Sequence, residues 1–194
     1  MSTTTTPDLD APGAGLPALE LFIARLMFSR KRKAGNRESF TRLFENERKA
    51  IRQLVERCPE EKRSERVLIK RIRGLEDSSR YWSVWMTLDH LRITNSAMGG
   101  AIALLGQGKV PDRKADTAAV KPSPEVGQEI EAAYEKSCDF VLSSVSGVDD
   151  LKTEMTYAHP WFGQMDAAGW NALTGFHMGI HRAQIEKILT EMGV

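Results

Sequence analysis

Apolar residues recur at three- and four-residue steps through four long segments of the chain, and no other sequence feature constrains the fold as strongly. Side chains with this period lie along one face of an α-helix. The spacing predicts helices over residues 37–58, from 84 to about 105, from 124 to 146, and from 167 to near the C-terminus. Because no segment shows a convincing apolar-polar alternation of the kind found in half-buried strands, we expect an all-α fold.

Long stretches rich in helix-breaking residues separate these four helices, which favours an up-down-type four-helix bundle with long crossover loops. Ser83 and Asp166 stand where N-caps are expected. A fifth apolar run, over residues 16–35, predicts an N-terminal helical extension. Residues 1–15 have the composition of a disordered tail. We therefore expect one domain over residues 16–194, a length that suffices for a single hydrophobic core.

The charges of the chain nearly cancel, with 27 Lys and Arg against 26 Asp and Glu. This balance gives the whole chain no electrostatic preference for nucleic acid or for an anionic membrane. A basic run over residues 30–37 could bind phosphate, but no nucleic-acid motif accompanies it and a solvated junction between two helices explains it better. We therefore expect neither a nucleic-acid partner nor a membrane partner.

The N-terminal residues contain no basic stretch leading into an apolar one, so they do not resemble a signal peptide. Cys58 and Cys138 lie too far apart in sequence for a CxxC redox pair, and two cysteines do not make a disulfide framework. Neither has a neighbouring histidine or basic cluster that would lower the pKa of its thiol, so we assign neither a nucleophilic role. These features favour a reducing, cytoplasmic setting.

His177 and His181 lie four residues apart on the last predicted helix, so their side chains leave the helix axis about 40° apart. Two imidazoles in this arrangement can bind one metal ion, and a third ligand would have to come from another segment. The pair lacks the glutamate of the HExxH zinc-protease motif, because Met178 follows His177. It also lacks the Glu-x-x-His pairs of di-iron bundles. By itself the spacing is more typical of ordinary polar residues on a helix.

Three phrases occur in order along the chain: WSVWMTLDHL over residues 82–91, HPWFG over 159–163 and HMGIHRAQIEKIL over 177–189. Together they resemble the DinB/YfiT-like superfamily of metal-dependent enzymes, over most of the chain from about Arg37 onward. The resemblance implies a four-helix bundle in which one histidine of the second helix and two of the fourth bind a divalent ion, commonly nickel or zinc. In this sequence those residues are His90, His177 and His181.

Known members of this family include thiol-dependent S-transferases and a thiol-dependent isomerase. The resemblance therefore implies a low-molecular-weight thiol as cosubstrate and a small electrophilic molecule as substrate. An ion held by three neutral imidazoles would equally activate water, as in a hydrolase. The sequence does not choose between a metal-dependent S-transferase and a hydrolase, and it assigns no catalytic residue.

Two further residues are candidates for the surroundings of this site. Gln184 lies three residues after His181 on the same helical stripe and could hydrogen-bond a ligand or a metal-bound water. A polar residue at the end of a bundle is an equally good explanation. His159, in the HPWFG corner, is expected to shape that corner or to line the mouth of a cavity.

A second function class stays open beside the enzyme. The basic run and the N-terminal helical extension also fit a non-catalytic stress-response or interaction module that retains the fold and acts through its surfaces. Helical bundles with exposed apolar stripes often pair. We therefore expect a homodimer in either case.

Overall fold

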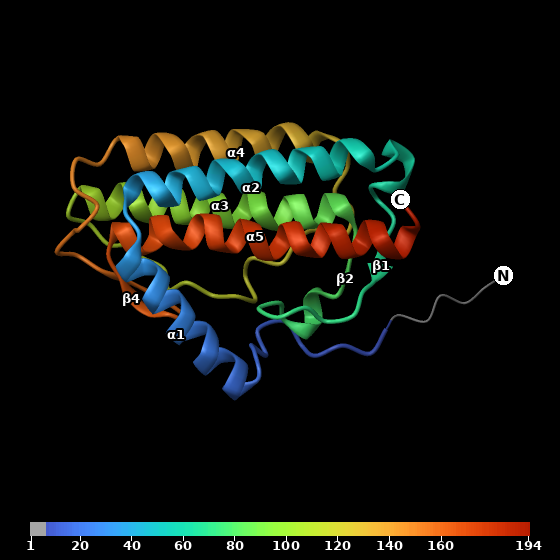
Figure 1. Ribbon diagram of the computed structural model, residues 1–194, viewed down its shortest axis with the longest axis horizontal. Coiled ribbons are helices and arrows are strands. Elements are labelled where there is room, and N and C mark those ends of the chain that lie inside the picture. The colour runs from blue at the N-terminus through green and yellow to red at the C-terminus, as the bar shows by residue number, and fades with distance from the viewer. Residues whose placement is uncertain (1–6) are drawn as a thin grey trace.

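The computed structural model describes residues 7–194, and four long helices lie side by side in it (Figure 1). The bundle consists of α2 (Arg37–Arg57), α3 (Val84–Gly106), α4 (Glu129–Ser146) and α5 (Ala167–Met192). A further helix, α1 (Ala18–Ala34), leaves the bundle at an angle and lies outside it. The expected all-α four-helix bundle with long crossovers and an N-terminal helical extension is confirmed.

Neighbouring helices of the bundle are not all antiparallel. Trp85 Nε1 donates to a carboxylate oxygen of Glu131 near the starts of α3 and α4, and Gly106 lies against Val148 at their far ends. These two helices therefore run in the same direction, and α2 and α5 run in the opposite one, as the colours of Figure 1 show. Since two parallel neighbours cannot be joined by a tight turn, residues 107–128 must return along the bundle before α4 begins.

The helix starts follow the capping residues of the sequence. The Asn36 side chain accepts a hydrogen bond from the Ser39 backbone N–H, and Ser39 returns one, which makes a capping box at the start of α2. Ser83 accepts from the N–H of Met86, and Asp166 accepts from the N–H of Gly169. Both predicted N-caps are thus confirmed.

The predicted start of the third bundle helix at Pro124 is wrong. The helix α4 begins at Glu129 and has no side-chain cap. Residues 124–128 form turns instead, in which the N–H of Gly127 donates to the side chain of Glu129 at 3.0 Å. The proline is compatible with a helical first turn, but the glycine three residues later favours the turn conformation.

Two short antiparallel hairpins accompany the helices. Strand β1 (Val67–Leu68) pairs with β2 (Tyr81–Trp82), and β3 (Tyr157–His159) pairs with β4 (Gly163–Met165). The crossover between α2 and α3 also contains two 3-10 turns, η1 (Glu60–Lys62) and η2 (Asp77–Ser79). Strands of two or three residues are too short to leave an alternating pattern in the sequence, which is why none was predicted.

The bundle encloses one continuous hydrophobic core. Its fully buried large side chains come from α2, α3 and α5, from the α2–α3 crossover and from β4, and include Phe44, Ile51, Ile69, Leu75, Leu88, Leu91, Ile102, Leu105, Met165, Met178, Ile185 and Ile188. Among the described residues, no helix is both long and apolar enough to cross a membrane.

Residues 1–6, part of the predicted disordered tail over 1–15, lie outside the described residues. Of the remainder, the N–H groups of Asp10 and Gly13 donate to the carboxylates of Asp77 and Glu76 at 3.1 and 3.3 Å. The division into a tail and one domain over 16–194 stays a prediction.

Gly175 permits the close approach of α5 to α2. A Cβ atom at this position would lie 3.0 Å from the backbone nitrogen of Phe44 and 2.9 Å from Cγ of Leu43. Because the backbone cannot yield as a flexible side chain can, we expect Gly175→Ala to lower the free energy of unfolding by about 1–3 kcal/mol. Urea denaturation followed by circular dichroism measures this change.

The matched control is Gly100→Ala, within α3, where a Cβ atom would meet nothing within 4 Å. Alanine favours the helix over glycine, so this variant should gain roughly 0.5–1 kcal/mol. Equal stabilities for the two variants would contradict the tight packing of α5 on α2.

Candidate metal centre

Three histidines from two helices converge inside the bundle. His90 belongs to α3, and His177 and His181 lie one turn apart on α5. One ring nitrogen of each histidine lies within 4.8 Å of the others, and the Nε2 atoms of His90 and His177 are 3.2 Å apart. The structure therefore brings together the three histidines that the family resemblance singled out.

The ring of His90 is oriented by the crossover between α3 and α4. Its Nδ1 lies 2.7 Å from the carbonyl oxygen of Val120. Since a carbonyl oxygen only accepts hydrogen bonds, Nδ1 carries the proton and donates it. The lone pair of the ring is then on Nε2, which faces the other two histidines.

The ring of His181 is oriented through Gln184. The Nδ1 atom of His181 lies 2.7 Å from Oε1 of Gln184, and Nε2 of Gln184 donates to the carbonyl oxygen of Ser79 at 2.7 Å. The second bond fixes which way the amide points, so its oxygen accepts from the imidazole and leaves the lone pair of His181 on Nε2. Gln184 is completely buried. Both polar atoms of its side chain are therefore used within the protein, one by the ring of His181 and one by the carbonyl of Ser79.

His177 differs from the other two because its Nδ1 is buried and has no hydrogen-bond partner among the described residues. Its Nε2 faces that of His90. Two nitrogens bound to one tetrahedral zinc at 2.0–2.1 Å would be about 3.3 Å apart, close to the 3.2 Å observed here. The donor set therefore fits a divalent ion held by three Nε2 atoms.

Burial keeps all three rings uncharged at neutral pH. Removal from water lowers the pKa of His90 and of His177 well below the usual value, and the nearby histidines lower it further. The same burial lowers the pKa of His181 to about 4. A metal ion binds neutral imidazole and competes with protons for it, so these rings are ready to act as ligands without first losing a proton.

No carboxylate joins this cluster of described residues. Asp89, next to His90 in sequence, turns away to bind Arg92 and the N–H of Ser123. Trp82 lies beside the cluster. Its ring is parallel to that of His181, with ring centres 6.1 Å apart, and tilted against that of His90, with ring centres 5.2 Å apart. The site is thus a neutral, three-nitrogen set beside an aromatic wall.

The fourth histidine is not part of this cluster, although it is near enough to contribute to the lowered pKa of His177. His159 Nδ1 accepts from the backbone N–H of Trp161 at 3.1 Å, and its ring stacks on Phe162. This arrangement shapes the β3–β4 corner.

The two cysteines are buried and unpaired, and burial raises the pKa of both thiols, that of Cys138 to about 12. The geometry gives neither of them the environment of a nucleophile.

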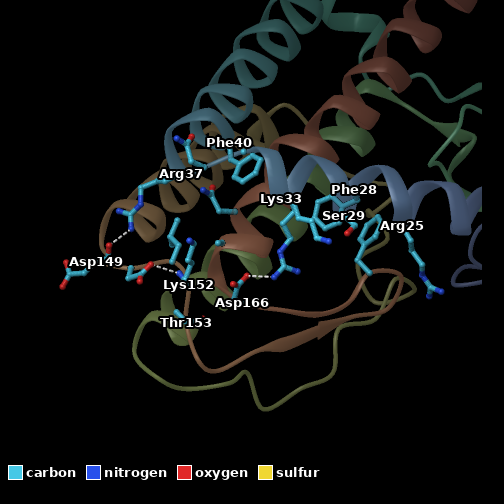
Figure 2. Close-up of a pocket in the computed structure, with 18 residues that line it drawn as sticks. Arg25, Phe28, Ser29, Lys33, Arg37, Phe40, Asp149, Lys152, Thr153 and Asp166 are labelled. Atoms are coloured by element: carbon cyan, nitrogen blue, oxygen red, sulfur yellow. Dashed lines mark hydrogen bonds and ion pairs between the residues drawn. The ribbon is translucent and has the colours of Figure 1, made fainter.

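A cavity of about 820 Å³, which no histidine lines, lies where α1 meets the starts of α2 and α5 and the loop after α4 (Figure 2). Arg32 binds Asp166 at 3.1 Å, and Arg37 donates to the carbonyl oxygens of Val148 and Asp149. The guanidinium groups of Arg32 and Arg37, which line this cavity, thus bind groups of the protein itself. The basic run over residues 30–37 is a junction between helices, as its composition suggested.

Sequence reasoning missed the backbone carbonyls of Val120 and Ser79, which orient the ligands. Carbonyl groups carry no residue signature, so no sequence signal could have identified them. The contact between His181 and Gln184 could have been found, because residues three apart are neighbours on a helix.

Comparisons with known proteins agree with this architecture. A crystal structure described as that of TT2238, a four-helix bundle protein, superposes with a TM-score of 0.58 at 17% sequence identity, covering 78% of this chain and 98% of that one. At this identity the likeness shows the fold alone. No curated protein matches the chain. The family model of the DinB superfamily matches residues 43–185, from within α2 to within α5, and includes all three histidines. The chain belongs to the DinB superfamily.

Proposed function

We propose that this protein binds one divalent metal ion through His90, His177 and His181 and uses it to activate a low-molecular-weight thiol, or water, for attack on a small electrophile. The observation that carries the proposal is the convergence of three neutral imidazoles, two of them buried and that of His177 half-buried, in which His90 and His181 donate their Nδ1 protons away from the shared centre. Outward hydrogen bonds of this kind are typical of histidines that bind metal. Nickel and zinc are the ions that we expect.

A divalent ion in such a site keeps its full charge and lowers the pKa of a thiol or water bound to it, which supplies a nucleophile at neutral pH. The chain's own residues hold the ligand geometry. The carbonyls of Val120 and Ser79 fix the ring orientations, directly and through Gln184. The indole of Trp82 keeps bulk water from one side of His181. With both cysteines buried, the thiol must be an external one.

The two free cysteines also support a proposal for the cellular setting. A low-molecular-weight thiol cosubstrate is abundant in reducing compartments, and both cysteines of the chain are free. We therefore propose that the protein acts in the cytoplasm on a small molecule.

Metal analysis tests the site directly. We expect about one equivalent of divalent metal per chain in protein purified without a histidine tag, because three ligands suffice for tight binding. His177→Ala and His181→Ala should each lose most of this metal. His159→Ala is the matched control, since His159 lies outside the cluster, and it should keep its metal. Wild-type protein without stoichiometric metal after loading would refute the site.

Gln184 should influence metal affinity without binding the metal. Gln184→Leu removes the acceptor of the His181 Nδ1 proton, and loss of such a partner costs about 10–100-fold in metal affinity. Competition with a chromogenic chelator measures this affinity. The control is Gln53→Leu at an exposed position of α2, and urea unfolding of both metal-free variants separates a loss of folding from a loss of ligand orientation. An unchanged affinity in a folded Gln184→Leu protein would exclude this role.

Reactivity assays separate the two nucleophiles. In the transferase case, loss of a small electrophile requires both the metal and an added thiol, and the product contains the thiol sulfur. In the hydrolase case, the reaction proceeds without thiol. His177→Ala should abolish either reaction, whereas His159→Ala should retain it. Mass spectrometry of the products identifies the nucleophile.

The alternative, a non-catalytic dimeric module, is favoured by one observation. The helix α1 lies before the matched residues 43–185 and exposes large apolar side chains. This reading predicts that substitutions on α1 abolish the cellular phenotype of the protein and that His177→Ala leaves it intact. The enzyme reading predicts loss of that phenotype in the His177→Ala variant.

A further inference from the structure

The helix α1 carries a continuous stripe of exposed apolar side chains. They recur at helical spacing along one face, with exposed fractions of 72% for Leu19, 65% for Phe22, 46% for Ile23, 43% for Leu26 and 51% for Met27. Other large apolar side chains that are exposed among the described residues lie singly on separate elements: Leu68, Val110, Phe140 and Met155. Scattered residues of that kind are normal, whereas a contiguous stripe indicates an interaction surface.

The opposite face of α1 holds the helix in place. Phe28 is buried and packs on the rings of Phe162 and Phe176, with centroids 4.6 and 5.9 Å away. At the other end, Glu20 binds Arg71 and accepts from the N–H of Gly74 at 2.7 Å. The stripe, which we define as residues 19, 22, 23, 26 and 27, is exposed on a fixed helix that lies outside the bundle (Figure 1). A fixed surface loses little conformational entropy on binding.

The exposed area is as large as the largest apolar patches found on monomers, about 300–600 Å², and patches of that size are often functional. A large apolar side chain has on the order of 200 Å² of surface, so the exposed fractions leave roughly 500 Å² uncovered on each chain. Two such stripes face to face would bury about 1,000 Å², the lower limit for a specific interface. A second copy supplies an apolar surface of matching length and size.

We propose that α1 pairs with α1 of a second copy in an antiparallel, two-fold symmetric contact centred between Phe22 and Ile23. In such an isologous interface, a contact of one residue with a second residue of the other copy occurs twice, once on each side of the axis. Leu19 of one copy then faces Leu26 of the other, and Phe22 and Ile23 pack about the axis. Four of the five stripe residues exchange in this way, and Met27 lies opposite Ala18 of the other copy.

The charges of α1 favour the antiparallel direction. Its C-terminal turns hold Arg30, Lys31, Arg32 and Lys33, whereas its N-terminal half has no basic residue before Arg25. A parallel pair would place the two basic clusters side by side. The antiparallel pair separates them by roughly 25 Å, which is about the length of the helix, and salt screens charges beyond about 8 Å.

Contacts of three basic side chains favour a second copy over a lipid surface as the occupant. Helices that lie on anionic membranes carry free basic side chains beside the apolar stripe. In α1, Arg25 Nε donates to the carbonyl oxygen of Trp161 at 2.5 Å, Lys31 Nζ lies 5.4 Å from the ring centre of Phe176, and Arg32 binds Asp166. Arg30 and Lys33 are exposed, so lipid vesicles are included among the tests.

Light scattering of the full chain tests the proposal. We expect twice the 21.7 kDa chain mass at micromolar concentration, and the chain mass itself for the Phe22→Asp/Leu26→Asp variant. Both residues are exposed in the single chain, so the variant should keep its helical circular dichroism. Met155→Asp is the control at an equally exposed position on a loop, and it should stay dimeric. A monomeric wild type, or a dimer that the α1 variant leaves intact, would overturn the proposal.

Cysteine cross-linking tests the direction. The two native cysteines are buried, so mild oxidation should link only introduced thiols. Ile23→Cys should cross-link to itself, and Leu19→Cys should cross-link to Leu26→Cys in a mixed sample but not to itself. Efficient self-linking of Leu19→Cys would establish a parallel pair and contradict the proposed symmetry. Monomeric protein that binds anionic lipid vesicles through α1 would assign the stripe to a membrane and overturn it as well.

Discussion

Three imidazoles packed against one another inside a helical bundle must stay uncharged, and two of them are also held by hydrogen bonds that much of the surrounding architecture serves to supply. Their ring centres are 4.4 to 5.1 Å apart, so a proton gained by one ring would repel charge on the others. Burial prevents this by lowering the pKa of each. The Nδ1 protons of His90 and His181 also need hydrogen-bond acceptors. The helices cannot supply these acceptors, because their own carbonyl groups are used within the helix. The acceptors come from the crossovers, with Val120 contributing one carbonyl and Ser79 another through Gln184.

The topology of the bundle makes those crossovers available. Because α3 and α4 are parallel neighbours, the chain between them must travel back along the bundle, and Val120 lies on that return path. The two crossovers are tied together beside the site by Lys121, whose Nζ binds the Glu76 carboxylate at 2.6 Å and the hydroxyls of Ser78 and Ser79. Burial alone would raise the pKa of Glu76, but the bonds from Lys121 hold it below its usual value. A charged pair therefore keeps the carbonyl of Ser79 in position.

The extent to which the sequence predicts this structure depends on the range of each interaction. Helical periodicity and the caps at Ser83 and Asp166 are local, so they could be predicted from neighbouring residues alone. The pairing of His177 with His181 is local as well. The contact of His90 with this pair spans 87 positions, and only the family resemblance pointed to it. The start of α4 was misplaced because a proline fits a helix start and a turn equally. The orienting carbonyls depend on the paths of long loops, which no residue pattern specifies.

The helix α1 links the histidine cluster to the apolar stripe. Its inner face packs through Phe28 on Phe176, the residue before His177, while its outer face carries the apolar stripe. Deleting α1 would thus expose Phe176 and Phe162 as well as remove the stripe, and a defect in the truncated protein could arise at either place. Substitutions confined to the outer face leave the contact of Phe28 intact. They isolate the stripe from the packing of α5, and so from the orientation of the two histidines that α5 carries.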